Sequence, residues 1–464
     1  MITTLFKKKK ALVFTEVLSH DSFFEGLRMK EFARLDEKQH VYLDFTGGNL
    51  YAQQQIDAHY KELSEHTFGN PHSTNPTSQF ATKKVEEARQ KVLNFFNAKG
   101  YFCVFTPNAS GALKIVGECY PFDTSSKFAL LADNHNSVNG IREYAKGYGA
   151  DFEYVPVQYE DLRISSQLLN QVLDQEVAGN KLFAFPAQSN VSGVKHNLNW
   201  IETAQQKGWD VLLDAAAYAP TNRLDLSKVK PDFVSISFYK IFGYPTGLGC
   251  LLIRKEKFNR LQKKWFAGGT VALAGVKSPS HFLIENHERF ENGTIDYLGI
   301  PALSIGLDFI ESIGMQRINE RVNSITTHMC VSLRKLKHSN GQPLVNIFGP
   351  GDRIETGGTL IMTFNNPDGK VIPFERIERL TNARNISIRS GCFCNPGLDE
   401  INNCLTTEEL SDYFTSRESG DYYDMIATLN KMRGAVRVSF GIATVQRDLD
   451  AFLKFAEDLI DHQY

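Results

Sequence analysis

Short apolar runs alternate with segments of helical period between residues 78 and 260. Val85, Ala88 and Val92 recur at helical spacing, whereas short apolar runs bounded by polar turns are typical of buried strands. Such runs occur at 102–105, 128–131, 152–157, 182–185, 211–213, 233–236 and 250–253. Strands that alternate with helices in this way predict a mostly parallel sheet wrapped by helices.

The pattern changes after about residue 306 to helices interleaved with fewer strands, which predicts a second, smaller domain. Its expected elements are a strand at 360–364, a helix at 374–381, a short strand at 386–388, a helix at 422–432, a strand at 436–440 and a final amphipathic helix that includes Leu449, Phe452 and Phe455. We therefore predict an α/β protein in three parts. They are an N-terminal arm (1–50) that packs on the small domain, a large domain (51–305) with a seven-stranded, mostly parallel sheet between helices, and a smaller α+β C-terminal domain (306–464).

Composition narrows the choice of partner. The 464 residues are 42% hydrophobic, enough for a large core, and 51 basic residues nearly cancel 53 acidic ones. Neither a nucleic acid nor a membrane surface is therefore expected, and the ligand should be a small molecule. The four lysines at 7–10 precede an apolar stretch too short for a signal peptide, and we expect a solvated arm there. Seven scattered cysteines predict free thiols in a reducing, cytoplasmic compartment.

Lys240 stands where the apolar run 233–236 gives way to a glycine-rich turn at 243–249. In open α/β sheets, ligands bind beyond the carboxyl ends of the strands, so an amine here is a candidate for covalent chemistry on a carbonyl cofactor. The alternative is a solvated surface lysine, and the neighbouring residues must decide between the two.

Other strand ends carry groups that suit such a cofactor. Asp214 ends an apolar run, where an ionised carboxylate could hold a positive charge on a ring nitrogen or could simply cap a turn. Ser110 and the free N–H groups of the helical run after it would suit a phosphate, although a plain strand-to-helix turn would look the same. Ser237 and Thr270 could add hydroxyl donors.

Two further polar residues follow predicted strands. His135 could stack on a flat ring or relay a proton, and a loop histidine is the alternative. The side-chain amides at 188–190, with Asn190 among them, could hydrogen-bond a phenolic oxygen of the cofactor. A phosphate site, a carboxylate for a ring nitrogen, a stacking imidazole, an amide and an amine together fit pyridoxal phosphate.

At this point the chain resembles the class V branch of the fold-type I pyridoxal-phosphate enzymes, the aminotransferase and cysteine desulfurase superfamily. The resemblance runs from about Tyr42 to Gly441. Four blocks are similar to the N-terminal cysteine desulfurase module of molybdenum cofactor sulfurases, namely 69–73, 237–247, 268–271 and above all 389–397.

The resemblance implies a role for each residue. Lys240 would hold the cofactor covalently, Asp214 would hold its ring nitrogen, and His135 would stack on the ring. Thr270 matches a position that reaches the neighbouring subunit's cofactor in dimeric relatives, so a homodimer is expected. The implied cofactor-binding set is Lys240, Asp214, His135, Ala109, Ser110, Asn190, Ala216, Ser237 and Thr270.

Cys392 and Cys394 are separated by one residue, and no second pair of ligands follows, so we expect no metal site here. The pair fits a reactive loop better, since a thiolate that takes sulfur from a cysteine substrate as a persulfide must be mobile, exposed and easily ionised. Gly391, Asn395 and Gly397 would permit that mobility. Alignment with the resembling family favours Cys394 as the persulfide carrier over Cys392, while packing is the alternative for both thiols.

Arg389 and Arg437 are candidates for a two-bond grip on a substrate carboxylate, with Asn190 beside them, because the planar guanidinium fits that group. Either could instead serve as an ion-pair partner on the surface.

The chain departs from the family pattern in several places. Tyr239 precedes the lysine where many desulfurases have histidine, and Ala217 stands where they often have glutamine. Gly397 is followed by Leu398 rather than by the usual Ala-Cys. The chain ends at Tyr464, where sulfurases continue into a domain that engages the molybdenum cofactor.

The function that we expect is a pyridoxal-phosphate-dependent cysteine desulfurase, which converts L-cysteine to L-alanine and leaves a persulfide on the enzyme, with a sulfur acceptor protein or cofactor as partner. One alternative is another class V activity, such as an aminotransferase, an epimerase or a C–S lyase acting on a different amino acid. The other is a non-catalytic scaffold or sulfur-relay protein that retains the fold.

Overall fold

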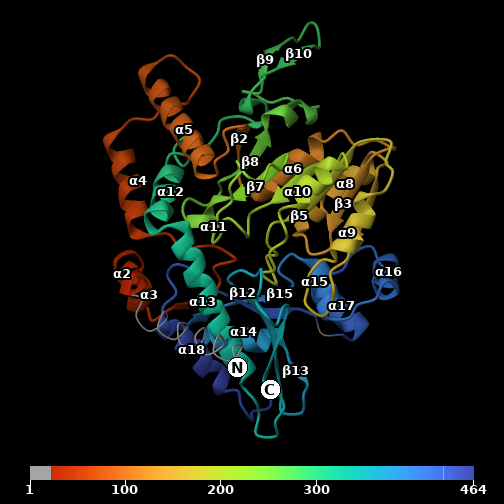
Figure 1. Cartoon of the computed structure of the whole chain (residues 1–464). Helices are drawn as coiled ribbons and strands as arrows, with labels where there is room; N and C mark the ends of the chain where they lie inside the picture. The colour runs from red at the N-terminus through yellow and green to blue at the C-terminus, as the bar shows by residue number, and fades with distance from the viewer. Residues whose placement is uncertain (1–21, 432) are drawn as a thin grey trace, which may run out of the picture.

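The computed structural model describes residues 22–431 and 433–464, so the predicted arm at 7–10 lies outside the described residues. Its largest sheet has seven strands in the order β2-β8-β7-β6-β5-β3-β4 (Figure 1). The strands are β2 (Tyr101–Thr106), β3 (Lys127–Leu131), β4 (Asp151–Val155), β5 (Lys181–Pro186), β6 (Asp210–Asp214), β7 (Phe233–Ser237) and β8 (Gly249–Arg254). Of these, β8 runs antiparallel to both of its neighbours and the others pair in parallel. The predicted seven-stranded, mostly parallel sheet is confirmed.

Helices cover both faces of this sheet, so its strands are apolar on both sides. Phe183 and Phe185 of β5 belong to the core that α5 and α12 cover, whereas Leu182 and Ala184 belong to the core under α6 and α8. The helices around the sheet are α4 (Gln53–Glu65), α5 (Pro76–Phe95), α6 (Ala109–Cys119), α7 (Asn136–Asn139), α8 (Ile141–Gly147), α9 (Ser166–Leu173), α10 (Trp200–Gln206), α11 (Phe238–Phe242) and α12 (Ala302–Ile313), with short 3-10 turns η1 (Lys255–Arg260) and η2 (His287–Phe290).

A second, antiparallel sheet lies below the first in Figure 1 and follows the order β11-β12-β16-β15, with β13 paired to β12. Its strands are β11 (Val345–Phe348), β12 (Thr359–Asn365), β13 (Val371–Ile372), β15 (Arg389–Gly391) and β16 (Ala435–Ser439). The helices of this half are α13 (Met315–Arg334), α14 (Phe374–Asn382), α15 (Pro396–Asn402), α16 (Thr407–Thr415), α17 (Tyr422–Leu429) and α18 (Gln446–Glu457). This α+β half confirms the expected strands and helices around 360–388 and 422–457.

The described part of the N-terminal segment, residues 22–50, contacts the C-terminal half. It forms α2 (Ser22–Glu31), α3 (Ala33–Glu37) and β1 (Val41–Tyr42), and β1 pairs in parallel with β14 (Ile386–Ser387). Arg28 is buried and donates to Asp448 of α18 at 3.1 Å and to Asp36 at 2.9 Å. The residue boundaries of the three predicted parts stay predictions.

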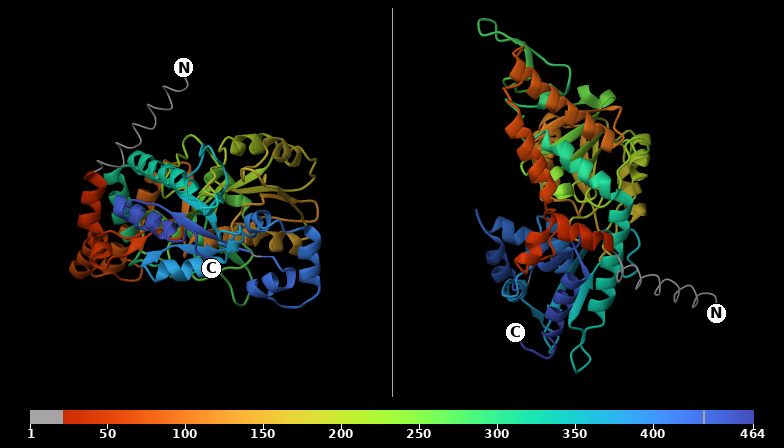
Figure 2. Two further views of the ribbon diagram at one scale, coloured as in Figure 1. Left: turned by 90° about the horizontal axis from the view of Figure 1, so that it is seen from below. Right: turned by 90° about the vertical axis from the view of Figure 1, so that its left-hand side faces the viewer.

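The hydrophobic pattern did not predict every element. The hairpin of β9 (Val271–Ala274) and β10 (His281–Leu283) projects from one end of the molecule (Figure 2), and its side chains are mostly exposed. The helices α15 and α16 and the strand β11 were also missed. Within the described residues, no helix is long and apolar enough to cross a bilayer.

Replacing Arg28 with alanine should lower the free energy of unfolding by about 3 kcal/mol, because it leaves the buried carboxylate of Asp448 without its counter-charge. The midpoint of the first urea transition measures this. Lys30→Ala on the same helix is the matched control, since the Lys30 ammonium is exposed and its removal should change the midpoint little. Equal midpoints for the two variants would contradict the expectation.

Candidate active site

The residues that the sequence singled out at strand ends surround one cavity of about 170 Å³ at the carboxyl edge of the large sheet. Lys240, Asp214, His135, Asn190, Ser110, Ser237, Ala109 and Ala216 line it. Thr270 does not, because it is buried at the base of the β9–β10 hairpin, where its hydroxyl bonds to Ala267. The parallel sheet therefore gathers eight of the nine predicted cofactor-binding residues.

Lys240 lies on the short helix α11, which starts directly after β7 and ends where the glycine-rich turn begins. The helix ends at Gly243, whose φ is +82° and where a Cβ would come within 2.4 Å of the backbone of Tyr51. Burial lowers the pKa of the Lys240 ammonium, and the nearby Asp214 opposes this shift only in part. An amine that loses its proton more readily is a better nucleophile toward a carbonyl.

Asp214 is 8% exposed at the end of β6. Its Oδ1 accepts hydrogen bonds from the Ser235 hydroxyl at 2.9 Å and from the Ala216 N–H at 3.0 Å. Oδ2 has no hydrogen-bond partner in the described part of the chain, so this oxygen remains free for a ligand. A carboxylate fixed in this way can hold a proton on a ring nitrogen.

The N-terminus of α6 brings hydroxyl groups together at the other end of the cavity. Ser110 Oγ lies 2.6 Å from Ser137 Oγ, and the Ser237 hydroxyl lies 3.5 Å from the Ala109 N–H. Free N–H groups at the start of an eleven-residue helix and three hydroxyls make a suitable cradle for a phosphate. Sequence reasoning missed Ser137, although its place two residues after His135 was a signal for it.

His135 is half-buried and precedes α7, where its Nδ1 accepts a hydrogen bond from the Ser137 N–H at 3.1 Å. Burial lowers the pKa of the imidazole, which outweighs the attraction of Asp214. His135 is therefore neutral near pH 7, with its proton on Nε2. A neutral ring can stack on a flat cofactor and can accept or pass on a proton.

Residues 392–395, which we call the thiol loop, form a tight turn. The Asn395 N–H donates to the Cys392 carbonyl at 3.1 Å, while Phe393 and Cys394 have φ of +58° and +54°. This is the pattern of a type I′ turn. Cys394 is exposed, whereas Cys392 is half-buried and burial raises the pKa of its thiol. Cys103, Cys250 and Cys330 are buried.

Hydrogen bonds connect this loop to residues that follow strands of the large sheet. The Asn136 N–H donates to the Cys394 carbonyl at 2.8 Å, and the Asn190 side-chain amide donates to the Phe393 carbonyl at 2.8 Å. Asn395 is fully buried and donates to the Asp133 carbonyl at 2.7 Å and to Asn190 Oδ1 at 3.0 Å. Asn395, which we expected to give the loop freedom, is therefore one of its anchors.

The two predicted carboxylate-binding arginines share one protein carboxylate. Asp44 Oδ1 accepts from Arg437 Nη2 at 2.8 Å, and Asp44 Oδ2 accepts from Arg389 Nε at 2.8 Å. Arg437 is buried and also donates to the Asn190 carbonyl at 2.8 Å, whereas Arg389 is exposed. Burial and the Asp44 charge raise the pKa of neighbouring Tyr42 to about 12. Sequence reasoning did not single out Asp44.

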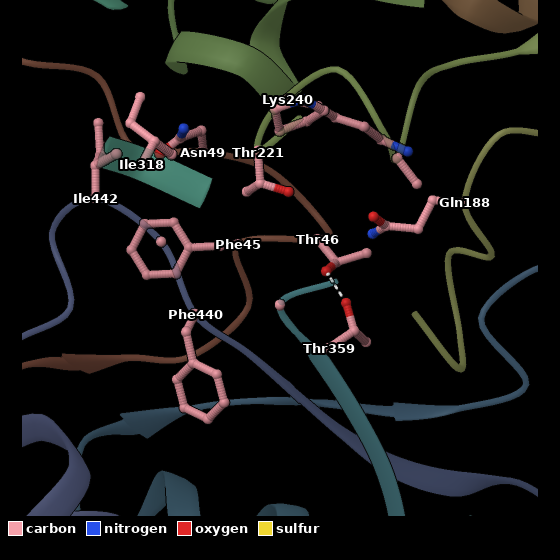
Figure 3. Close-up of a pocket in the computed structure, with 14 residues that line it drawn as sticks. Phe45, Thr46, Asn49, Gln188, Thr221, Lys240, Ile318, Thr359, Phe440 and Ile442 are labelled. Carbon is pink, nitrogen blue, oxygen red and sulfur yellow. Dashed lines mark hydrogen bonds between the residues drawn. The ribbon is translucent and has the colours of Figure 1, made fainter. Parts of the chain in front are cut away.

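A second cavity lies on the other side of Lys240, between the two sheets (Figure 3). Phe45 and Phe440 form one wall, and Thr46 Oγ1 lies 2.7 Å from Thr359 Oγ1 at its base. Lys240 lines both cavities, so its amine can meet a ligand from either side. Among the described residues, no group of three or more His, Cys, Asp or Glu side chains is placed to hold a metal ion.

The family model "Aminotransferase class-V" matches residues 41–452. The chain belongs to the class V aminotransferase family. Molybdenum cofactor sulfurase of Solanum lycopersicum is 37% identical over 93% of this chain and 57% of its own length. The Homo sapiens molybdenum cofactor sulfurase is 36% identical over 93% of this chain and 51% of its own length. The chain thus spans little more than half the length of these relatives.

Solved structures agree with this assignment. A cysteine desulfurase from Thermococcus onnurineus has a TM-score of 0.77 at 25% identity, over 94% of this chain and 98% of that one. The cysteine desulfurase CsdA from Escherichia coli has a TM-score of 0.74 at 19% identity, over 94% and 99%, which is a likeness of fold. The fold is that of the pyridoxal-phosphate-dependent cysteine desulfurases, as predicted. The chain is an enzyme of the class V family, and pyridoxal 5′-phosphate is its cofactor.

The side chains of the cavity fit that cofactor. The free oxygen of Asp214 suits a protonated ring nitrogen, and the hydroxyls of Ser110, Ser137 and Ser237 at the start of α6 suit its phosphate. Lys240 supplies the amine that the aldehyde needs. Asn190 uses its amide on the thiol loop, so its predicted contact with a ring oxygen or with the substrate would require those bonds to be shared.

Replacing Lys240 with alanine should remove the visible absorbance of the covalently held cofactor and lower turnover about a thousandfold, because no other amine lines the cavity. Borohydride reduction followed by peptide mass spectrometry locates the labelled lysine. Lys195→Ala is the matched control, since burial also lowers the pKa of Lys195 but its side chain lies in a different cleft. A label found on Lys195 would contradict this assignment.

Replacing Ser137 with alanine should weaken cofactor binding about three- to tenfold, because it removes one hydroxyl donor from the phosphate end of the cavity. Equilibrium dialysis of pyridoxal phosphate against the apoprotein gives the dissociation constant. The control is Ser227→Ala, which removes an exposed serine hydroxyl far along the chain. Unchanged binding by Ser137→Ala would remove Ser137 from the site.

Proposed function

We propose that this chain is a cysteine desulfurase that converts L-cysteine to L-alanine and takes the sulfur as a persulfide on Cys394. The observation that carries the proposal is the exposed thiol of Cys394 on a loop that is hydrogen-bonded to Asn136 and Asn190, beside the cavity that contains Lys240. A thiol in that position has no use in most amino-acid chemistry, but sulfur transfer requires one.

The proposed transfer balances without an external oxidant. The Cys394 thiolate attacks the Sγ atom of the substrate, the Sγ–Cβ bond breaks, and its electron pair stays with the carbon side. Protonation at Cβ gives alanine, and the sulfur remains on Cys394 as a persulfide. The bound pyridoxal phosphate supplies the electron sink that makes the substrate Cα and Cβ reactive.

The residues around the cavity divide the remaining work. The Lys240 amine, with its pKa lowered by burial, is suited to take the Cα proton and to return a proton to carbon. Asp214 keeps the cofactor's ring nitrogen protonated through its free oxygen. His135, held neutral by burial, can accept the proton of a thiol that enters beside it. Arg437 and Arg389 supply positive charge for the substrate's carboxylate.

The lining of this cavity includes Tyr239 and Ala217, where many desulfurases are expected to have histidine and glutamine. Tyr239 lines the cavity and is half-buried, and burial raises the pKa of its phenol, so it stays a neutral hydrogen-bond donor at pH 7. Ala217 presents no polar group next to it. We infer that Tyr239 replaces the polar contacts that histidine and glutamine make elsewhere in the superfamily.

We also infer a homodimer in which Thr270 approaches the partner's cofactor. Supporting this, Thr270 sits at the base of the projecting β9–β10 hairpin, which carries the exposed apolar side chains of Leu273, Val276 and Phe282. Exposed apolar surface on a projecting element is typical of a subunit contact. Because the matched relatives are named as molybdenum cofactor sulfurases, that cofactor or a protein that relays sulfur to it is the proposed acceptor.

Incubation with L-cysteine should yield alanine and one protein-bound sulfane sulfur on Cys394, detected by peptide mass spectrometry. Cys394→Ser should lower alanine formation at least about a hundredfold, because the serine hydroxyl cannot take up sulfur. Cys404→Ser, which removes another exposed thiol, is the control and should form the persulfide as the wild type does.

Three outcomes discriminate between the alternatives. Persulfide on Cys392 in place of Cys394 would reassign the carrier within the loop. Full turnover by Cys394→Ser would favour another class V activity. Absence of both alanine and sulfane sulfur from the wild-type holoenzyme would refute the desulfurase proposal.

A further inference from the structure

Asp44 lies between the two arginines that are suited to bind a substrate carboxylate. It follows β1 in the N-terminal segment and is 7% exposed. Its Oδ1 accepts from Arg437 Nη2 at 2.8 Å and its Oδ2 accepts from Arg389 Nε at 2.8 Å, while Arg389 Nη2 forms an ion pair with Oδ2 at 2.8 Å. One carboxylate therefore meets two guanidinium groups, and the cluster keeps one net positive charge.

Asp44 bonds to the same Arg437 nitrogen that a second carboxylate would use, so two like charges would meet at Nη2. A guanidinium binds a carboxylate with two neighbouring N–H groups, and Nη2 belongs to both pairs that Arg437 offers. Arg437 Nη1 already donates to the Asn190 carbonyl. Its Nε is buried and has no hydrogen-bond partner in the described part of the chain. The Nε–H of Arg437 is thus free on the side of the guanidinium that it shares with Nη2, the nitrogen that also donates to Asp44.

An unpaired buried Nε is costly unless a ligand satisfies it. The same residues connect this position to the active site, because the charges of Arg437, Arg389 and Asp44 all act on the pKa of Lys240. The Arg437 guanidinium also lies 5.0 Å from the ring centre of Phe393 in the thiol loop. Arg437 is thus a neighbour of the thiol loop, and its charge acts on the lysine.

The backbone next to Asp44 is shaped around its carboxylate. A Cβ at Gly47 would come within 2.4 Å of Asp44 Oδ2, so only glycine leaves the carboxylate its present place. The Gly47 and Gly48 N–H groups both donate to the Asp44 carbonyl, which fixes the main chain, while among the described residues the carboxylate accepts hydrogen bonds from the two arginines alone. The side chain can therefore change partners without a change in the main chain.

We propose that Asp44 is a positioning residue that fills the seat of the substrate's carboxylate on Arg437 and Arg389, and that substrate binding exchanges one carboxylate for the other. This rests on the proposed amino-acid substrate, and it adds a residue that has no contact with the reacting atoms. In the free enzyme, the negative charge of Asp44 reduces the repulsion between the two guanidinium groups, and its hydrogen bonds orient them. The entering substrate completes the bonds of Arg437 at Nε and displaces Asp44 from Nη2.

If the two carboxylates exchange, removing the Asp44 charge should strengthen the binding of a carboxylate ligand. The probe is 3-mercaptopropionate, which has the thiol and carboxylate of cysteine but no amine to react with the cofactor. Asp44→Asn holoenzyme should bind it at least about fivefold more tightly than the wild type in calorimetric titrations, because the competing carboxylate is gone. Asp44→Glu, which keeps the charge, should not gain affinity.

Two controls separate this role from a purely structural one. The uncharged amide of the probe, 3-mercaptopropionamide, should bind both proteins equally, since it does not compete for the arginines. Arg389→Gln should bind 3-mercaptopropionate about threefold or more weakly, because Asp44 then pairs with Arg437 alone. Far-ultraviolet circular dichroism checks that each variant is folded, and Asp44→Ser, which also removes the charge, takes the place of Asp44→Asn if that variant does not fold.

Tighter binding of the acid but not of the amide by Asp44→Asn supports the exchange. Unchanged or weaker binding of the acid by folded Asp44→Asn overturns it, as does unchanged binding by Arg389→Gln or failure of the acid to bind any of these proteins. These outcomes need no turnover, so they are distinct from the test of the desulfurase proposal. Alanine formation by the wild type with no exchange would refute the role of Asp44 alone.

Discussion

The parallel pairing of β5, β6 and β7 is the constraint on which the site depends. Their register sets Asp214 opposite Ser235 and Pro186, so the ends of all three strands meet at one edge of the sheet. Side chains alternate along a strand, and a shift of one residue would turn Asp214 away from the cavity and away from the Ser235 hydroxyl. The carboxylate, the lysine of α11 and the amide of Asn190 are thus brought together by the backbone hydrogen bonds of the sheet.

The C-terminal half of the chain adds the thiol to this edge through a small number of polar contacts. Asn190 is central to them, because its side chain contacts Phe393 and Asn395 and its carbonyl accepts from Arg437. Buried amides of this kind are costly unless every partner is present, so they fix one position of the thiol loop relative to the sheet. The distance between Cys394 and the cavity is therefore a property of the whole chain and not of the loop alone.

Much of the fold follows from local pattern, since the seven strands of the large sheet are apolar runs bounded by polar turns. Lys240, Asp214, Ser110 and His135 could be found because each follows such a run. Asp44 could not be found in this way, because its partner Arg437 is 393 residues away in sequence and the pairing exists only in the folded chain. The β9–β10 hairpin was missed although β9 is a short apolar run at 271–274, and the side chains of this run are mostly exposed instead of buried in a core. The roles of the site residues stay predictions until they are measured.

The charges of the site are arranged in two groups of different composition. Asp214 and Lys240 can balance each other at one end, and Asp44 balances only one of the two arginines at the other. An amino acid carries one charge of each sign, and its carboxylate is drawn to the end that keeps a surplus of positive charge. Burial makes the amine of Lys240 easier to deprotonate, and the two arginines act in the same direction. The surplus that would orient the substrate therefore also favours the neutral lysine that its reaction requires.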